Sequence, residues 1–332
     1  MNTHSKLPDD RVLVVAEIGN NHEGDVHAAL DLVRAAACAG CDAVKLQVFR
    51  AESFVRPSQP ERLAQMTGFQ MADDEIEQVV ALARELGLLV IATPLDLPSL
   101  ALVGPMVDAL KIASGDNDHL PLIRACAAVD VPLVISTGLA DLATVRRAIE
   151  AVREVAAGHE VWLLQCTAAY PAMPEEVNLG AIQTMAREFG VPVGYSDHTS
   201  GVEVAPLAVA AGARMIEKHI TLSHRRSDFR DHLISADPSE LTRMVSHIRW
   251  VERVAGDGIK RPLDAETPLM TAARRSIVAA QDIPQGAMLE EADITWMRPR
   301  DGLRPGEESR ILGRTLTRTR HRGQSLLEAE TE

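Results

Sequence analysis

Two histidines stand where their side chains could bind one metal ion. His198 follows the apolar run 191–195 and His219 follows the run 214–218, so each comes at the end of a candidate strand. If these strands are neighbours in a parallel sheet, the two imidazoles converge at one edge. Two histidines with open positions for water and substrate are typical of a catalytic divalent-metal site. The other histidines considered are weaker candidates (His22 and His232) or expected surface residues (His119 and His224).

A second group of side chains suits a substrate that carries phosphate and carboxylate. Lysines provide point charges, and hydroxyl groups add directional hydrogen bonds. These residues fall where apolar runs end: Lys45, Thr93, Lys111, Ser114, Ser136 and Ser196. The alternative for either lysine is an ion pair with a structural carboxylate.

Glu17 ends the first apolar run of the chain. A carboxyl group there could have a raised pKa and act as an acid–base group, or it could be a partner of the metal site. An ion pair with a nearby lysine is the structural alternative.

The elements that must position these residues are eight short apolar runs separated by helix-like stretches. The runs are residues 12–16, 43–48, 88–92, 108–112, 132–136, 161–165, 191–195 and 214–218. Eight such units predict a (β/α)₈ TIM barrel, in which functional side chains gather at the carboxyl ends of the strands. All eight runs end in polar residues, which favours one site at that rim. An open doubly wound sheet is the alternative, but no GxGxxG motif follows the first run.

The pattern changes after Val254. Residues 259–271 are rich in Pro and charge and are predicted to form a linker. We therefore predict a catalytic barrel over residues 1–258 and a small, mostly-β domain over residues 272–332.

Composition limits the class of protein further. The formal net charge of -13 argues against a nucleic-acid partner, because phosphate neutralisation needs a basic surface. The chain has no apolar run long enough to span a membrane and no apolar signal core near its start, which predicts a cytoplasmic protein. Cys38 and Cys41 form a CxxC motif, but we expect both thiols to be ordinary buried residues. The compartment is then expected to be reducing.

Several stretches of the chain resemble the sialic acid (N-acetylneuraminate) synthase family. They are AEIGNNHEGD, AVKLQVF, ATPLD, LKIASGD, ISTGL, QCTAAYP, GYSDHT and EKHITL. The tail, with RRSIVAAQDIPQGAMLEEADITWMRP and ILGRTL, resembles the antifreeze-like (SAF) domain of the same enzymes. The resemblance covers nearly the whole chain.

The resemblance implies condensation of phosphoenolpyruvate with an open-chain aldose like N-acetylmannosamine, giving a nonulosonic acid and phosphate. It implies that phosphoenolpyruvate is held by Lys45, Thr93, Lys111, Ser114, Ser136 and Ser196. His198 and His219 would ligate manganese or magnesium, and Glu17 would handle the proton of the attacking water.

The acceptor sugar is expected, again by resemblance, to contact Gln47, Asp116, Tyr170, Asp231 and Arg298. The family forms a domain-swapped homodimer, in which Arg298 of one tail domain would reach the sugar pocket of the partner.

This chain departs from the family pattern around the acceptor. The segment 48–92 is shorter than usual, so a sugar-contacting loop is expected to be missing, and residues 223–231 replace a pattern ending in Gly-Pro-Asp-His or Gly-Ser-Asp-His. Asp116, Ala168 and Arg300 also differ from the commoner residues. Two alternatives follow: a degenerate, non-catalytic sugar-binding relative, and a metal-dependent aldolase that cleaves sugar acids.

Overall fold

The structure is a computed structural model that describes residues 7–8 and 10–332 of the chain. Its internal contacts divide the chain into two compact units, Met1–Gly256 and Asp257–Glu332. The sequence had placed the end of the first domain at residue 258, close to this division.

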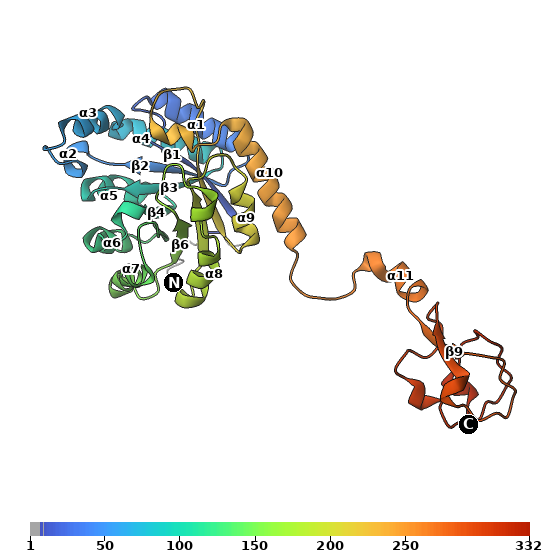
Figure 1. The fold of residues 1–332 in the computed structure, drawn as a ribbon. Helices are drawn as coiled ribbons and strands as arrows, with labels where there is room; N and C mark the ends of the chain where they lie inside the picture. Colours follow the sequence, from blue (N-terminus) through green and yellow to red (C-terminus); the bar gives the residue numbers. More distant parts are fainter. Residues whose placement is uncertain (1–6, 9) are drawn as a thin grey trace. The chain divides into compact units, whose positions relative to one another are not determined.

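The first unit is a closed barrel of eight parallel strands (Figure 1). The strands are β1 (Leu13–Gly19), β2 (Ala43–Val48), β3 (Leu89–Pro94), β4 (Ala109–Ile112), β5 (Leu133–Ser136), β6 (Val161–Cys166), β7 (Val193–Asp197) and β8 (Met215–His219). Each strand pairs with the next, and β1 pairs with β8 to close the ring. The predicted TIM barrel is confirmed.

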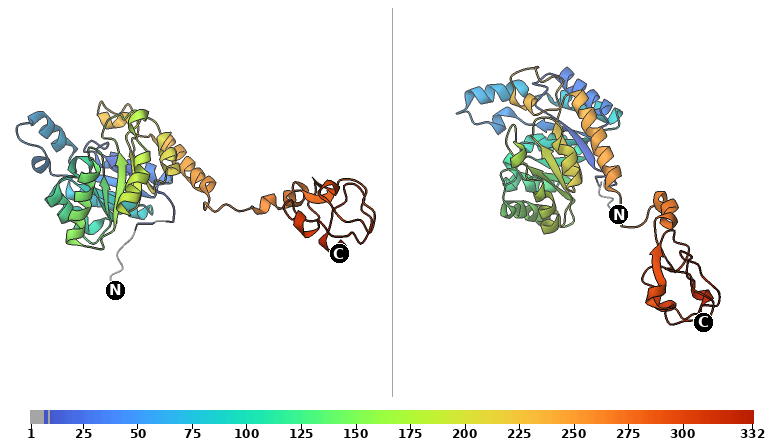
Figure 2. Two further views of the ribbon diagram at one scale, coloured as in Figure 1. Left: turned by 60° about the horizontal axis from the view of Figure 1, so that its bottom comes forward. Right: turned by 45° about the vertical axis from the view of Figure 1, so that its right-hand side comes forward.

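Helices surround the strands in all three views (Figures 1 and 2). They are α1 (Val26–Cys38), α4 (Asp73–Glu85), α5 (Leu97–Val103), α6 (Leu120–Ala127), α7 (Leu142–Val155), α8 (Gly180–Phe189), α9 (Val204–Ala210) and α10 (Pro238–Ala255). Helix α1 illustrates how the sequence encodes them. Asp25 accepts hydrogen bonds from the backbone N–H groups of His27 and Ala28, which caps the helix, and Leu32 and Val33 lie on the face buried toward the barrel.

The inside of the barrel has an apolar lower layer and a polar upper layer. Alternate residues of a strand point to the same side, so residues two apart on one strand lie in successive layers inside the barrel. The lower layer contains Val15, Ile91, Val134, Trp162 and Met215. Two residues further along the same strands come Glu17, Thr93, Ser136, Leu164 and Glu217, all buried. Most of the polar groups therefore lie at the carboxyl ends of the strands, above the packed apolar layer.

The segment between β2 and β3 is helical and contributes to the site. It forms α2 (Ala51–Phe54), α3 (Pro60–Phe69) and α4. Phe54, Arg62 and Met66 from α2 and α3 line the cavity at the carboxyl ends of the strands, so this segment supplies a wall of the site.

The cysteine prediction is half right. The four cysteines form no disulfide, and Cys41 is buried as expected. Cys38 is exposed, because it ends α1 on the side facing away from the barrel. The expectation that both thiols are buried was therefore wrong for Cys38.

The second unit has its own small core. Strands β9 (Ser276–Ala279) and β10 (Ile294–Met297) pair antiparallel, and buried Ile277, Ile311 and Leu326 pack with them. One short helix, α11 (Thr267–Ala272), precedes them and begins in the predicted linker. Short 3₁₀ turns and isolated β-bridges make up much of the rest. This agrees with the predicted small, mostly-β domain.

Among the residues that the structure describes, no helix combines the length and the apolar character needed to cross a membrane.

Candidate active site

A cavity of about 530 Å³ opens at the carboxyl ends of the barrel strands. It gathers almost all the residues that the sequence had singled out: Glu17, Lys45, Gln47, Lys111, Ser114, Asp116, Ser136, Tyr170, Ser196, His198, His219 and Asp231. These side chains come from the ends of seven of the eight strands or from the loops that follow them. The structure thus brings most of the predicted strand-end residues together in one cavity.

The floor of the cavity is a buried network of two lysines and two glutamates. Lys45 Nζ lies 2.9 Å from Glu217 Oε1 and 3.3 Å from Glu17 Oε2. Lys111 Nζ lies 3.6 Å from Glu217 Oε2 and donates to Ser136 Oγ at 2.6 Å. Ser196 Oγ donates to Glu217 Oε1 at 2.9 Å. Both lysines are therefore ion-paired, as the structural alternative expected, and Glu217 is the shared partner.

The two glutamates differ in acidity although both are buried. Burial raises the pKa of Glu17 to about 7, against the opposing effect of Lys45. Burial also favours the neutral form of Glu217, but Lys111 and Lys45 outweigh it and hold the pKa of that carboxyl well below its usual value. At neutral pH Glu217 is ionised, whereas Glu17 can both take up and release a proton.

The two lysines differ in the same way. Burial lowers the pKa of Lys111 to about 8, even though Glu217 opposes the shift. Burial alone would lower the pKa of Lys45 too, but Glu17 and Glu217 together raise it above the ordinary value. Lys45 is thus a fixed cation, while Lys111 loses its charge in mildly basic solution.

His198 and His219 lie together above this floor, with ring centroids 5.7 Å apart. The Nδ1 atom of His198 is 3.0 Å from the backbone oxygen of Thr167, so it carries the proton and leaves Nε2 as a lone-pair donor. The Sγ atom of Cys166 is 3.7 Å from the same Nδ1. Burial lowers the pKa of His219 well below its ordinary value, so this imidazole is neutral.

The residues present fit a divalent cation. Neutral imidazoles are the form that binds metals, and a carbonyl that holds the second nitrogen of a ligand is a common supporting contact. The buried Nδ1 of His219 has no hydrogen-bond partner among the described residues, which is an unusual state for a buried polar atom. His198 and His219 would hold the ion, with the remaining positions open to water or substrate.

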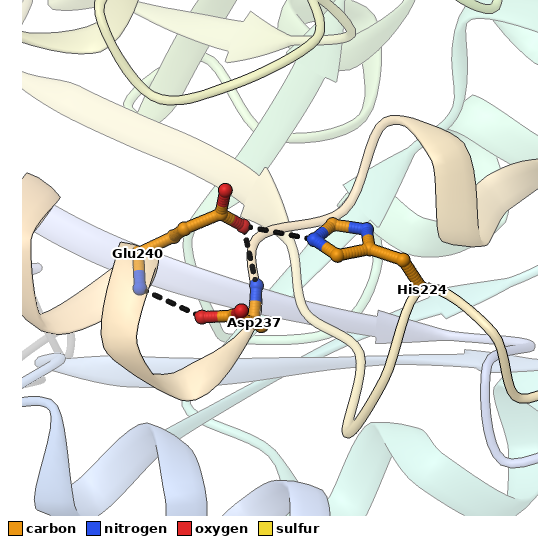
Figure 3. A group of neighbouring side chains, drawn as sticks. All are labelled: His224, Asp237 and Glu240. Atoms are coloured by element: carbon orange, nitrogen blue, oxygen red, sulfur yellow. Dashed lines mark hydrogen bonds and ion pairs between the residues drawn. The ribbon is translucent and has the colours of Figure 1, made fainter.

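Three other potential metal ligands gather outside this cavity (Figure 3). Ligand atoms of His224, Asp237 and Glu240 lie within 4.8 Å of one another. They already bond each other: the backbone N–H of Glu240 donates to Asp237 Oδ1 at 2.8 Å, and His224 Nε2 is 3.0 Å from Glu240 Oε2. Asp237 and Glu240 form the capping box of α10, so the cluster has a structural role as a clamp on the loop before that helix.

This loop, residues 221–237, is held in place by further polar contacts. His232 bonds Thr221 Oγ1 at 2.9 Å and Glu23 Oε1 at 3.1 Å, and Ser235 Oγ donates to the backbone oxygen of Asp231 at 2.6 Å. His22 accepts from the backbone N–H of Gly24 at 3.0 Å, and burial lowers its pKa to about 4. His22 and His232 therefore stabilise loops and do not line the cavity.

The outer wall of the cavity contains a stack of three side chains. The Tyr170 ring lies 4.3 Å from the His198 ring at an interplanar angle of 28°. On the Tyr170 ring lies the guanidinium of Arg230, whose Cζ is 4.7 Å from the ring centroid. Arg230 comes from the loop 221–237, in the stretch that the sequence predicts to depart from the family pattern.

Two predicted site residues are not part of the cavity lining. Thr93 is buried at the end of β3, and its Oγ1 has no hydrogen-bond partner among the described residues. Arg298 belongs to the second unit, so its expected contact with the sugar pocket of a partner stays a prediction. Sequence reasoning missed the central place of Glu217 and the presence of Arg230. The signal for Glu217 was available, because it lies two residues before His219 and so faces the same side of β8.

The fold and the cavity define a TIM-barrel enzyme with its site at the carboxyl ends of the strands. Residues 32–260 match the model of the NeuB family, and residues 274–330 match the SAF domain. The chain belongs to the NeuB family.

Relatives support this assignment over most of the chain. N,N'-diacetyllegionaminic acid synthase of Legionella pneumophila is 38% identical over 331 residues, which are 95% of this chain and 93% of that protein. Human N-acetylneuraminate-9-phosphate synthase is 31% identical over 290 residues, 83% of this chain and 80% of that protein. The crystal structure of N-acetylneuraminic acid synthetase from Leptospira borgpetersenii superposes with a TM-score of 0.75 at 31% identity, covering 79% of this chain and 90% of that one.

Proposed function

We propose that the chain is a synthase that condenses phosphoenolpyruvate with an open-chain, N-acetylmannosamine-like aldose, releasing phosphate and forming a nonulosonic acid. The observation that carries this proposal is the buried network of Lys45, Lys111 and Glu217 in the same cavity as His198 and His219. Its cations and hydroxyl groups can bind a phosphorylated carboxylate, and the two histidines lie where a carbonyl group of a second substrate could be bound. The named activities of the relatives fit the same chemistry.

The lysines and hydroxyls bind and orient phosphoenolpyruvate. Lys45 and Lys111 offset its negative charge, and Ser114, Ser136 and Ser196 supply directional hydrogen bonds, as Thr93 does if it turns toward the ligand. Binding an anion here replaces part of the contact that Glu217 makes to both lysines.

The chemistry joins C3 of phosphoenolpyruvate to the aldehyde carbon, while water adds at C2 and the C2–oxygen bond to phosphate breaks. A divalent cation, manganese or magnesium, held by His198 and His219 would act as a Lewis acid toward the aldehyde oxygen. Glu17 takes the proton of the attacking water, a task suited to a carboxyl group whose pKa is about 7. Gln47 holds Glu17 in position by donating to its Oε1 at 2.7 Å.

The acceptor occupies the outer part of the cavity, beside Gln47, Asp116, Tyr170 and Asp231. We propose that the protein works in the cytoplasm as a domain-swapped homodimer, with Arg298 of one copy completing the sugar pocket of the other. Light scattering tests whether the protein is a dimer. The activity of mixed dimers, in which one copy lacks Arg298, tests whether this arginine completes the pocket of the other copy.

A phosphate-release assay tests the reaction. The proposal predicts release only when phosphoenolpyruvate, a divalent cation and a suitable aldose are all present. Release of pyruvate from a sugar acid without phosphoenolpyruvate would instead favour an aldolase, and sugar binding without turnover would favour a non-catalytic relative.

A further inference from the structure

A buried ion pair lies on the outer side of the barrel, beside the two histidines of the cavity. Asp197 precedes His198 at the end of β7, and Lys218 precedes His219 at the end of β8. The two charged residues are partners in the parallel register of these strands. Because successive strand residues point to opposite sides, both turn away from the cavity that the histidines line.

The two charges of this pair are closed off from solvent. Neither side chain is exposed, and Lys218 Nζ lies 3.2 Å from Asp197 Oδ2. Tyr195 donates from its hydroxyl to Asp197 Oδ1 at 3.3 Å. A buried ion pair often contributes no more to stability than apolar residues of the same size would. Stability alone is therefore a weak explanation for this pair, and its other hydrogen bonds indicate what it holds.

Both charged groups bind Thr199, the residue that follows His198. Asp197 Oδ1 accepts from the backbone N–H of Thr199 at 2.9 Å and from its hydroxyl at 2.7 Å. Lys218 Nζ donates to the backbone oxygen of Thr199 at 2.6 Å. Asp197 and Thr199 flank His198, so the backbone on both sides of this imidazole is tied to the lysine of β8.

These side chains extend the link between β7 and β8 past the end of their backbone pairing. The pairing runs from Tyr195 to Asp197 on β7, so His198 lies one residue beyond it. The backbone oxygen of Thr167 orients the His198 ring at 3.0 Å from Nδ1, but it belongs to the loop after β6 and not to β8. The bond from Lys218 to Thr199 thus connects the backbone next to His198 with the strand that carries His219.

Resting on the metal site of the proposed function, we propose that Asp197 and Lys218 are positioning residues that set the separation and orientation of His198 and His219 for a shared divalent cation. They touch neither the cation nor a substrate and act through the backbone of Thr199. A binding constellation works only when its groups are held within about 0.5 Å of the required geometry. Without the pair, both imidazoles remain but converge less well.

Variants of the pair separate this role from a contribution to stability. Lys218→Met and Asp197→Ala each leave one buried charge uncompensated, so each should lower the melting temperature. The double variant Asp197→Ala/Lys218→Met leaves no such charge, so its melting temperature should recover in part. It still lacks every bond from the pair to Thr199. Asp197→Asn keeps one oxygen that can accept from Thr199 and is the conservative variant.

A matched control pair lies at the amino-terminal end of the barrel. Asp42 is buried and accepts from the backbone N–H of Val14 at 2.8 Å, and it pairs with Arg249. Arg249 donates to the backbone oxygen of Val12 at 2.7 Å. This pair also joins a carboxylate and a cation to the backbone of one strand, but it lies away from the histidines. Asp42→Ala and Arg249→Met are the control variants.

Calorimetric titration of the full chain with Mn²⁺ is the first measurement. Lys218→Met and Asp197→Ala should each weaken binding by about 10- to 100-fold, as for groups that orient metal ligands. The double variant should bind no better than either, although its melting temperature recovers in part. Asp197→Asn should lose less affinity than Asp197→Ala. Both control variants should keep the affinity within about twofold, as for independent sites, while their melting temperatures fall.

NMR of the metal-free full chain is the second measurement. The nitrogen resonances of the His198 imidazole report its tautomer and the hydrogen bond of Nδ1 to the Thr167 oxygen. We expect Lys218→Met and the double variant to shift or broaden these resonances. The control variants should leave them unchanged.

Two results overturn the inference: a Mn²⁺ affinity that follows the melting temperature through all variants, controls included, or unchanged His198 resonances in Lys218→Met. If the unsubstituted protein binds no Mn²⁺, the metal site of the proposed function fails, and the His198 resonances still decide whether the pair positions this imidazole. If Asp197→Ala does not fold, Asp197→Asn and Lys218→Met decide the outcome by the same criteria.

Discussion

Lys45 Nζ lies 2.9 Å from Glu217 Oε1 at the floor of the cavity, and both side chains are buried. Glu217 also contacts Lys111 and accepts from Ser196, so one carboxylate organises three of the residues proposed to bind phosphoenolpyruvate. A buried carboxylate between two lysines can be exchanged for an anionic ligand.

Glu217→Gln should destabilise the protein and make it more responsive to anions. Removing one partner of a buried pair costs about 3–5 kcal/mol, because the remaining charge is left uncompensated. Phosphoenolpyruvate or inorganic phosphate should therefore raise the melting temperature of the variant more than that of the unsubstituted protein. Glu203→Gln, at a side chain that is 73% exposed, is the control and should change stability by less than about 0.5 kcal/mol. Equal anion shifts in both proteins would show that Glu217 does not occupy the anion site.

Affinity for phosphoenolpyruvate should fall as pH rises above about 8. Burial lowers the pKa of Lys111 to about 8, so its charge is present below that pH and is lost above it. We expect KM for phosphoenolpyruvate to rise by up to about tenfold per pH unit above pH 8. Lys111→Met should show a high KM throughout and no such rise. A KM that stays flat to pH 9.5 in the unsubstituted protein would contradict the assignment.

Metal binding should depend on the histidines of the cavity and not on the cluster in Figure 3. His219→Ala should weaken Mn²⁺ binding by at least about a hundredfold, because one of two protein ligands is lost. His224→Ala removes a histidine that bonds Glu240 outside the cavity, and should leave the affinity unchanged. Calorimetric titration with Mn²⁺ distinguishes the two sites. The reverse order of effects would place the ion at α10.

Glu17→Gln should lower kcat while leaving the fold and phosphoenolpyruvate binding largely intact. The amide keeps the size of the side chain but cannot accept the proton of water, and losing an acid–base group costs about 10²–10⁴ in rate. Glu61→Gln, on the exposed side of α3, serves as the control. Steady-state kinetics at saturating substrates measure the effect. A kcat within about fivefold of the unsubstituted protein would remove Glu17 from the proton transfer.

The barrel and most of its site were predictable because local rules determine them. Apolar runs such as 43–48 predict strands, and the closed parallel topology brings their carboxyl ends together. His198 and His219 could be paired from sequence for this reason, since β7 and β8 are neighbours. Once a strand is predicted, the residues that follow its end can be placed at the rim of the barrel.

Other features depended on contacts that no local pattern records. Glu217 meets Lys45 and Lys111 only because barrel closure brings β8 close to β2 and β4, which are far from it in the sequence. Arg230 lies in a loop, and its stacking on Tyr170 depends on where Phe229 and Ser235 anchor that loop. Asp197 and Lys218 also sit near the rim, but they point away from the cavity and pair with each other at 3.2 Å, because strand residues alternate in direction.

The most direct test of the central claim is a combined measurement of phosphate release and product mass. The protein, Mn²⁺, phosphoenolpyruvate and an acylamino aldose should give one phosphate per molecule of a product whose mass is that of the aldose plus pyruvate. Omission of any one component should abolish both signals. The account is contradicted if a broad panel of aldoses releases no phosphate, or if phosphate appears without the aldose and no condensed product forms.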